Sequence, residues 1–333
     1  MNPKVLYLTS DNQDYLNDGL LHGLRELLAG NVVDYPKQEI LYKSYPPKAL
    51  RQLHGRGFTL YGLLEDIPLD RSGVTRKVMD REYDLVVIGD VYRSWGLFLQ
   101  LWPYLIPAKT AILDGADTPA IFPFAGKWWR RSYWRRLPTA HRRFVYFKRE
   151  WTGDTLYFRC FRLLPRFLCR AFAGRMRLHR ISFAIPEGKI VTGFPIKRKL
   201  LGSHVVDREV AAKLNVHTSY VFETEEAYYR DLQESKFAVT TRRAGWDCLR
   251  HYEIAANGCV PCFRDLDRKP ATCSPHGLDE SNCVIYHDAN ELLRRISVME
   301  DAEYSRLQSN TLAWVRNNTT RMAAERLLGC LEL

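Results

Sequence analysis

Residues 241–263 read TRRAGWDCLRHYEIAANGCVPCF, and the order of residue types in this stretch decides the fold. An apolar run at residues 236–241 predicts a short buried strand just before it. Residues 247–257 have helical composition, and Gly258 and Pro261 end that helix. Residues 260–263 predict the next strand. This strand–helix–strand order is typical of a parallel α/β sheet.

The loop between the first strand and the helix has the composition of an anion-binding site. In an open parallel sheet, ligands lie beyond the carboxyl ends of the strands, where the next helix offers free N–H groups and a partial positive charge. The residues expected there are Arg242, Arg243, Gly245, Trp246 and Asp247, followed on the helix by Arg250 and His251.

Glu253 is the acid of this helix. It shares one face with Leu249 and Ala256, so we expect it among apolar neighbours. A carboxylate in that place needs a partner, which is either a pair of ligand hydroxyls or Arg250 one turn back. The position of Glu253 alone does not distinguish between these two partners. His251 likewise either contacts a phosphate or faces solvent beside Arg250.

The ending of this helix, EIAANGCVP at residues 253–261, resembles the donor-binding motif of GT-B glycosyltransferases, particularly the bacterial exostosin-like group of surface-polysaccharide enzymes. Residues 14–36, 84–95 and 112–117 resemble the same group. The resemblance implies two Rossmann-like domains facing a cleft, a nucleotide-sugar co-substrate, and Glu253 on the ribose. Retaining members often carry an acid eight positions earlier, which is Gly245 here, so the stereochemistry stays open.

Composition sets the domain organisation. The chain has 333 residues, 46% of them hydrophobic and 26% charged, which suits two folded domains. We expect an acceptor domain at 1–150, a basic amphipathic insert at 151–180 and a nucleotide-sugar domain at 181–333, with C-terminal helices crossing back. No apolar run is long enough to span a membrane, and the N-terminus lacks a signal-peptide pattern, which predicts a cytoplasmic protein.

The first domain is expected to place acids at the ends of its strands. Its predicted strands are residues 4–9, 31–34, 84–89, 110–113 and, as the last one, 143–148; residues 181–185 then open the second domain. An acceptor hydroxyl in an inverting reaction needs a general base. The candidates are Asp90, Asp114 and Asp117, with His22 behind them. Asp90 and Asp114 have the alternative of capping loops, and His22 that of a core histidine.

A basic, aromatic block lies between residues 127 and 186. It holds sixteen Lys and Arg and only two acids, whereas the whole chain has a net charge of +11. Arginines beside Trp and apolar residues favour an anionic membrane surface. The alternatives are single-stranded nucleic acid, which lacks a supporting fold signature, and an ordinary solvated face or acidic-glycan groove. The membrane or acceptor residues expected here are Trp128, Trp129, Arg130, Arg131, Trp134, Arg135, Arg159, Arg162, Arg166 and Arg170.

These features together predict transfer of a sugar from a nucleotide sugar to a lipid-linked cell-surface glycan at the inner face of the membrane. Arginines and the helix start would neutralise the leaving group, so neither a metal nor a cofactor is expected. The alternative is a non-catalytic protein that binds a membrane surface or single-stranded nucleic acid. The donor base, the sugar, the linkage and the oligomeric state stay open.

Overall fold

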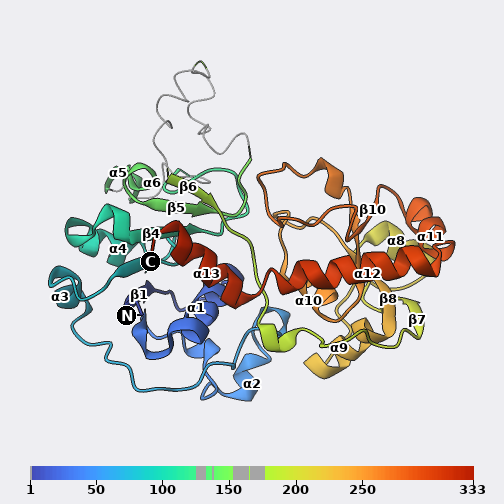
Figure 1. The fold of residues 1–333 in the computed structure, drawn as a ribbon, viewed down its shortest axis with the longest axis horizontal. Coiled ribbons are helices and arrows are strands. Elements are labelled where there is room, and N and C mark those ends of the chain that lie inside the picture. Colours follow the sequence, from blue (N-terminus) through green and yellow to red (C-terminus); the bar gives the residue numbers. More distant parts are fainter. Residues whose placement is uncertain (1, 125–132, 137–138, 153–164, 166–176) are drawn as a thin grey trace. The chain divides into compact units, whose positions relative to one another are not determined.

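The computed structural model describes residues 2–124, 133–136, 139–152, 165 and 177–333 (Figure 1). The chain forms two compact units. The first comprises Met1–Ser182, Pro270–Ser274 and Arg321–Leu333, and the second comprises Phe183–Lys269 and Pro275–Thr320. The ranges predicted from sequence are continuous, whereas the first unit also takes two short segments from the C-terminal part of the chain.

The first unit is built on a six-stranded parallel sheet in the order β2-β1-β3-β4-β5-β6. Its strands are β1 Val5–Leu8, β2 Val32–Tyr35, β3 Leu85–Ile88, β4 Thr110–Asp114, β5 Val145–Lys148 and β6 Arg177–Arg180. The five predicted strands are confirmed. The prediction that residues 143–148 form the last strand is wrong, because β6 pairs with β5 in parallel. The strand expected at 181–185 is also wrong.

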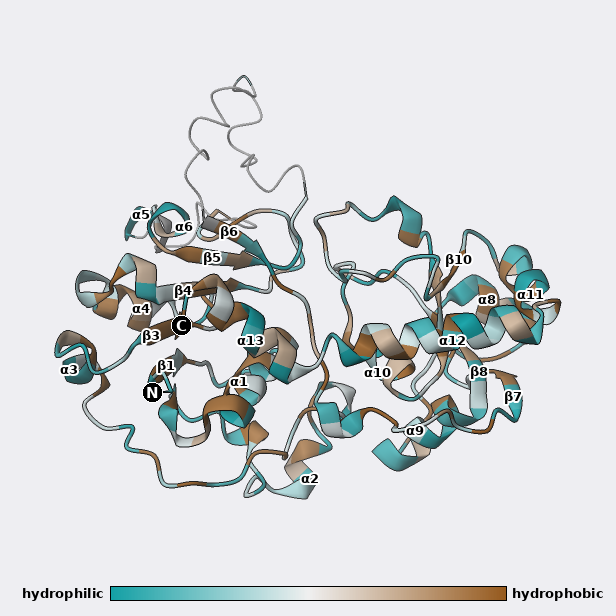
Figure 2. Ribbon diagram, in the orientation of Figure 1, coloured by the Kyte–Doolittle hydropathy of each residue, from teal (hydrophilic) through white to brown (hydrophobic). Residues whose placement is uncertain are grey.

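The helices of the first unit cover this sheet. They are α1 Tyr15–Leu28, α2 Pro47–Leu50, α3 Val74–Met79, α4 Trp95–Leu101, α5 Tyr133–Arg136, α6 Ala140–Arg143 and α13 Thr320–Cys330. The core includes Leu6, Ile88 and Ile112 from the strands and Val78 and Phe98 from the helices, all buried. Figure 2 shows β3 and β5 mostly in the hydrophobic colour, as expected for strands of a parallel sheet with both faces covered.

The second unit has a four-stranded parallel sheet in the order β10-β9-β8-β7. Its strands are β7 Lys199–Leu201, β8 Ser235–Thr240, β9 Val260–Arg264 and β10 Val284–Tyr286, and its helices are α8 Arg208–Leu214, α9 Glu225–Glu234, α10 Leu249–Ala256, α11 Ala289–Ser297 and α12 Asp301–Arg316. The predicted order β8–α10–β9 is confirmed. Gly258 follows α10 at a φ of 63°, the left-handed region that favours glycine.

The C-terminal helices divide between the two units. Helix α12 belongs to the second unit, whereas residues 321–333, which hold most of α13, belong to the first. The predicted return of the C-terminal part of the chain to the first domain is therefore confirmed for α13, whereas α12 stays with the second unit. Among the described residues, none of the helices has the length and apolar character required to cross a membrane.

A buried ion pair joins the carboxyl ends of β4 and β5. Asp114 and Lys148 stand opposite each other in register, their charged atoms lie 2.8 Å apart, and both side chains are 0% exposed. The hydroxyls of Tyr146 and Tyr92 also donate to the Asp114 carboxylate. Burial lowers the pKa of Lys148. Either charge would be destabilising in the interior without its partner, so each residue requires the other.

Replacing Asp114 tests this dependence. We expect Asp114→Ala to lower the free energy of unfolding by about 3–5 kcal/mol, because it leaves the Lys148 ammonium buried without its partner. Urea unfolding followed by tryptophan fluorescence measures the loss. The control is Asp80→Ala, which removes an exposed partner of Arg76 and should leave the midpoint nearly unchanged. An Asp114→Ala loss below about 1 kcal/mol would contradict the interpretation.

Candidate functional site

The loop between β8 and α10 lies at the carboxyl end of the second unit's sheet. Arg242 and Arg243 are exposed, whereas Gly245 and Trp246 are buried. The amide of Arg243 donates to the carbonyl of Gly245 over 3.0 Å, which folds the loop back on itself. The two arginine side chains therefore extend into solvent from a tight turn.

His251 holds this loop in place. Its side chain is fully buried on α10, with Nδ1 3.0 Å from the Thr240 hydroxyl and Nε2 3.0 Å from the carbonyl of Trp246. The alternative of a solvent-facing His251 is wrong, because the ring fills the space between the end of β8 and the loop. Both ring nitrogens face protein groups, so His251 positions the loop.

Asp247 is also turned inward. One carboxylate oxygen accepts from the amide of Phe183 over 2.7 Å, and the other accepts from the hydroxyl of Tyr252 over 3.0 Å. The side chain is buried. Asp247 therefore ties the start of α10 to the first residue of the second unit, and both its oxygens face protein donors.

Glu253 lies on α10 among buried residues, as its helical position predicted, and is 9% exposed. Its Oε2 accepts from the hydroxyl of Tyr228 on α9 over 3.0 Å. Burial and the nearby carboxylate raise the pKa of Tyr228, so the hydroxyl keeps its proton and donates it. Sequence reasoning named a ligand or Arg250 as the partner and missed Tyr228, which lies 25 residues away in the chain.

An open hollow of about 370 Å³ lies beside the loop, at the carboxyl ends of β8 and β9. It is lined by Thr241, Arg242, Trp246, Arg264, Asp265 and Arg268. The Arg242 guanidinium lies over the Trp246 ring, 4.8 Å from its centroid, and among the described residues no acid lies within ion-pair distance of it. The hollow thus offers a free cation and an aromatic wall.

Positive potential also surrounds the first turn of α10. Burial lowers the pKa of His204 to about 4, with help from Arg250 and Arg243. His204 is buried, and its Nδ1 has no hydrogen-bond partner among the described residues. The ring of Tyr220 meets it edge-on at 5.0 Å. Burial is the main cause of this lowered pKa, and the added effect of two arginines indicates a local positive charge that would attract an anion.

Asp265, Asp267 and His287 form a group that the sequence analysis passed over. Their ligand atoms all lie within 4.8 Å of one another at the carboxyl ends of β9 and β10. The spacing Asp-x-Asp was visible in the sequence, but His287 joins it only through the pairing of β10 with β9. Arg268 lies 3.4 Å from Asp265 and His287 lies 2.9 Å from it, so ion pairing accounts for the cluster.

Asp90 follows β3 in the first unit with a φ of 42°. Its Oδ2 accepts from the Ser10 hydroxyl over 2.9 Å and lies 2.8 Å from the Arg93 guanidinium. Asp14 and Asp18, which sequence reasoning missed, lie at the start of α1. Burial raises the pKa of Asp18 to about 7, against hydrogen bonds from Gln38 and Tyr61 that lower it. Two backbone amides donate to Asp14.

The other acids proposed as bases have protein partners. Asp114 is fully buried against Lys148, so its proposed role as a general base is wrong, because a base must reach the proton it takes. Asp117 pairs with the buried Arg149. His22 is buried on α1, with Nδ1 3.6 Å from Glu26, which agrees with the alternative of a core histidine.

Most of the proposed membrane residues lie outside the described part of the chain. These are Trp128, Trp129, Arg130, Arg131, Arg159, Arg162, Arg166 and Arg170. Trp134 and Arg135 lie on α5, where Arg135 is exposed. The membrane prediction therefore still rests on composition.

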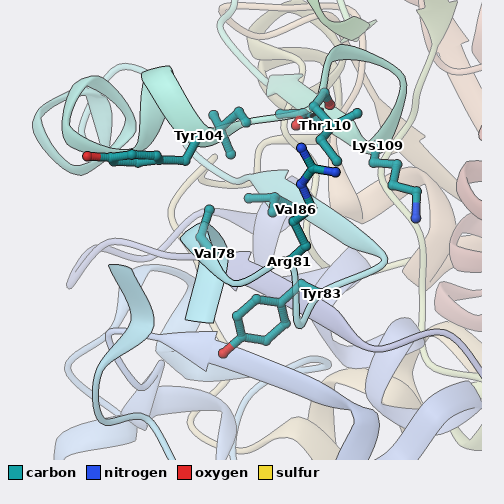
Figure 3. A pocket seen from close by; sticks show the side chains of 9 residues that line it. Val78, Arg81, Tyr83, Val86, Tyr104, Lys109 and Thr110 are labelled. Atoms are coloured by element: carbon teal, nitrogen blue, oxygen red, sulfur yellow. Dashed lines mark hydrogen bonds between the residues drawn. The ribbon is translucent and has the colours of Figure 1, made fainter. Parts of the chain in front are cut away.

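A small cleft opens at the opposite edge of the first unit's sheet, where β3 and β4 begin. Tyr83, Tyr104, Lys109 and Thr110 are among the side chains that line it (Figure 3). It encloses about 20 Å³, room for about one water molecule, so it is too small for a sugar or a nucleotide.

No protein-family model matches this sequence, and none of the curated proteins matches it. Solved structures match over nearly its full length. HepE of Anabaena in complex with UDP has 10% sequence identity and a TM-score of 0.57, and the match covers 99% of each chain. The trehalose-6-phosphate synthase OtsA has 11% identity and a TM-score of 0.56, again over 99% of each chain.

The trehalose-6-phosphate enzyme of E. coli, bound with UDP-2-fluoro glucose, matches with a TM-score of 0.53 and 11% identity over 98% of each chain. These neighbours are GT-B glycosyltransferases. The chain has the GT-B fold. This confirms the predicted fold class, and membership of the exostosin-like group stays a prediction.

Histidine titration tests the electrostatics of the second unit. We expect His204 to stay neutral down to about pH 4, whereas His287 should titrate above its ordinary pKa because Asp265 accepts a hydrogen bond from it. The unfolded chain protonates His204 near pH 6.5, so this residue's contribution to stability falls as the pH drops from about 6.5 to about 4. Two-dimensional NMR of the ring C–H groups measures both values. An ordinary pKa for His204 would contradict the described environment.

Proposed function

We propose that this protein is a glycosyltransferase that moves a sugar from a nucleotide-sugar donor to a glycan acceptor. The observation that carries the proposal is the loop between β8 and α10. There, exposed arginines stand at the carboxyl end of a parallel sheet, just before the helix that carries the buried Glu253. The GT-B fold supports this reading, and structures of the neighbour HepE contain UDP or UDP-glucose.

The arginines would act on the leaving group. As the bond between sugar and diphosphate breaks, negative charge grows on the departing phosphate oxygen. Arg243 and Arg250, with the partial positive charge at the start of α10, would stabilise that charge without first reorganising water. Arg242, which lies over Trp246 beside the open hollow, would add to this potential. His251 contributes by holding the loop.

Glu253 would hold the ribose. An ionised carboxylate accepts hydrogen bonds, and the two ribose hydroxyls are donors. The Tyr228 hydroxyl occupies Oε2 and fixes the orientation of the group. The Tyr228 ring also packs against Tyr220 and Phe222, which holds the hydroxyl in place beside Glu253.

The acceptor would be a lipid-linked cell-surface glycan at the cytoplasmic face of the membrane, as in surface-polysaccharide synthesis. The basic, aromatic block of residues 127–186 supports this part of the proposal through its composition. Charge stabilisation by arginines would work without a metal or a cofactor. A non-catalytic protein that binds membranes or single-stranded nucleic acid is the competing hypothesis.

Calorimetric titration with UDP, GDP, CMP and ADP tests the donor site. We expect one of these nucleotides to bind. Glu253→Gln should weaken its affinity at least tenfold, because an amide is a poorer partner than a carboxylate for two hydroxyl donors. The wild-type protein should bind the matching 2′-deoxynucleotide more weakly than the ribonucleotide. Glu253→Gln should reduce the affinity for the deoxynucleotide only slightly further, since the 2′-hydroxyl and Glu253 act as a pair. Arg243→Ala should weaken the diphosphate more than the nucleoside.

The control is Glu280→Gln, an exposed acid of the second unit, which should leave the affinity unchanged. Binding should also raise the pKa of His204 above about 4, because the phosphates neutralise Arg243 and Arg250, while burial continues to lower it. If none of the four nucleotides binds, the transferase proposal fails.

Vesicle flotation tests the membrane part separately. We expect the full chain to float with vesicles rich in phosphatidylglycerol at low salt and to be released by high salt, as screening of a basic surface requires. Changing Arg159, Arg162, Arg166 and Arg170 to Gln should reduce the bound fraction severalfold. Neutral phosphatidylcholine vesicles are the control. A protein that stays at the bottom with anionic vesicles, or that prefers single-stranded oligonucleotides, contradicts this part.

A further inference from the structure

The carboxyl end of the first unit's sheet gathers polar groups that the proposed mechanism has not used. Ser10 follows β1, Asp14 caps α1, and Asp90 follows β3. The Ser10 hydroxyl donates to Asp90 Oδ2 over 2.9 Å. Asp14 Oδ1 accepts from the amides of Leu16 and Asn17 over 3.0 and 3.1 Å. In an open α/β sheet, this edge is where ligands bind.

The two carboxylates are near neighbours. Burial raises the pKa of Asp14, and the negative charge of Asp90 raises it further. Asp14 Oδ2 and Asp90 Oδ1 accept no hydrogen bond from the described residues, whereas the other oxygen of each carboxylate does. Each acid thus has one oxygen held by the protein and a second that remains available as an acceptor.

Asn17 is the independent observation that points to a ligand. Its side chain is 5% exposed, yet within the described part of the chain neither its Nδ2 nor its Oδ1 has a hydrogen-bond partner. A Cβ added to Gly89 would lie 3.1 Å from Asn17 Oδ1, so the amide oxygen lies beside the end of β3, one residue before Asp90. An unsatisfied buried amide destabilises the folded protein, and a bound hydroxyl would remove that cost.

The backbone at Asp90 is held in an unfavourable conformation. Its φ of 42° lies in the left-handed region, which is unfavourable for a residue other than glycine. Ser94 fixes the turn, since its hydroxyl contacts the carbonyls of Gly89 and Asp90 over 2.7 and 3.1 Å. The turn aims the carboxylate of Asp90 toward Ser10.

We propose that Asp14, Asn17 and Asp90 form the acceptor subsite and bind neighbouring hydroxyls of an uncharged sugar. This inference rests on the proposed function and names the chemistry of its acceptor end. Carboxylates accept from hydroxyls, and an amide both donates and accepts, so the set matches groups that are donors and acceptors at once.

The charge of the subsite excludes acidic sugars. Among the described residues, the cations beside these acids are already engaged, because Arg93 pairs with Asp90, and the buried Arg149 pairs with Asp117 and Glu150. A carboxylate or phosphate on the acceptor sugar would therefore face two acids, and the described residues offer it no free cation. The subsite selects a neutral sugar by repelling the charged one.

Saturation-transfer NMR on the full chain, with methyl glucoside, galactoside and mannoside and the matching methyl uronides as probes, tests the proposal. At least one neutral glycoside should bind, and its uronide should bind at least tenfold more weakly. Asp14→Asn and Asp90→Asn should each weaken the neutral glycoside at least tenfold. Both substitutions preserve the fold, since Asn caps helices as well as Asp does and tolerates the left-handed region.

The matched control is Asp288→Asn, the same change at the N-cap of α11 in the second unit, which should leave glycoside binding unchanged. Nucleotide affinity, measured in parallel, separates the two proposals. If wild type binds a nucleotide but no neutral glycoside, or if either variant or the uronide binds as tightly as the reference, the subsite is wrong while the transferase stands. If glycosides bind as expected and no nucleotide does, the subsite stands and the transferase proposal fails.

Discussion

Parallel pairing of strands is the constraint on which both sites depend. All strands of each sheet point the same way, so the residues that follow them gather at one edge. In the second unit this edge collects the arginine loop after β8 and the Asp265 loop after β9, and in the first unit it collects Ser10 after β1 and Asp90 after β3. Short apolar strands thereby place polar loops, distant in sequence, within reach of a single ligand.

Burying a polar group is costly, so the presence or absence of a protein partner distinguishes structural residues from candidate site residues. Asp114 and Asp247 lie at these edges, but protein donors satisfy them, so their burial stabilises the fold. Asn17 differs, since its buried amide has no hydrogen-bond partner within the described residues. A buried polar group that the fold leaves unsatisfied calls for an explanation, and a bound ligand would supply one. Whether a buried polar group has a hydrogen-bond partner is therefore a better guide to function here than whether it lies near a strand end.

The sequence predicted what depends on local patterns. Apolar runs and the Gly258 and Pro261 signals located β8, α10 and β9, whereas β6 was missed because its basic residues at the sheet edge carry no apolar run. Hydrogen-bond partners that depend on tertiary packing could not be predicted from the sequence. The Tyr228 hydroxyl on Glu253 and the Trp246 carbonyl on His251 depend on how a helix and a loop pack, which residue spacing does not encode.

Under the proposed function, the opposite charges of the two proposed sites follow from what each end of a sugar transfer requires. A departing diphosphate gains negative charge, so its site needs cations that no acid neutralises, as Arg242 is within the described chain. An acceptor hydroxyl must instead be oriented and must lose its proton as it attacks, which calls for acceptor groups such as Asp14 and Asp90. Arginines at the acceptor end would hold the hydroxyl oxygen and lower its nucleophilicity, and acids at the donor end would repel the diphosphate. The first unit accordingly commits Arg93 and Arg149 to ion pairs, and this leaves carboxylate oxygens facing the edge of its sheet.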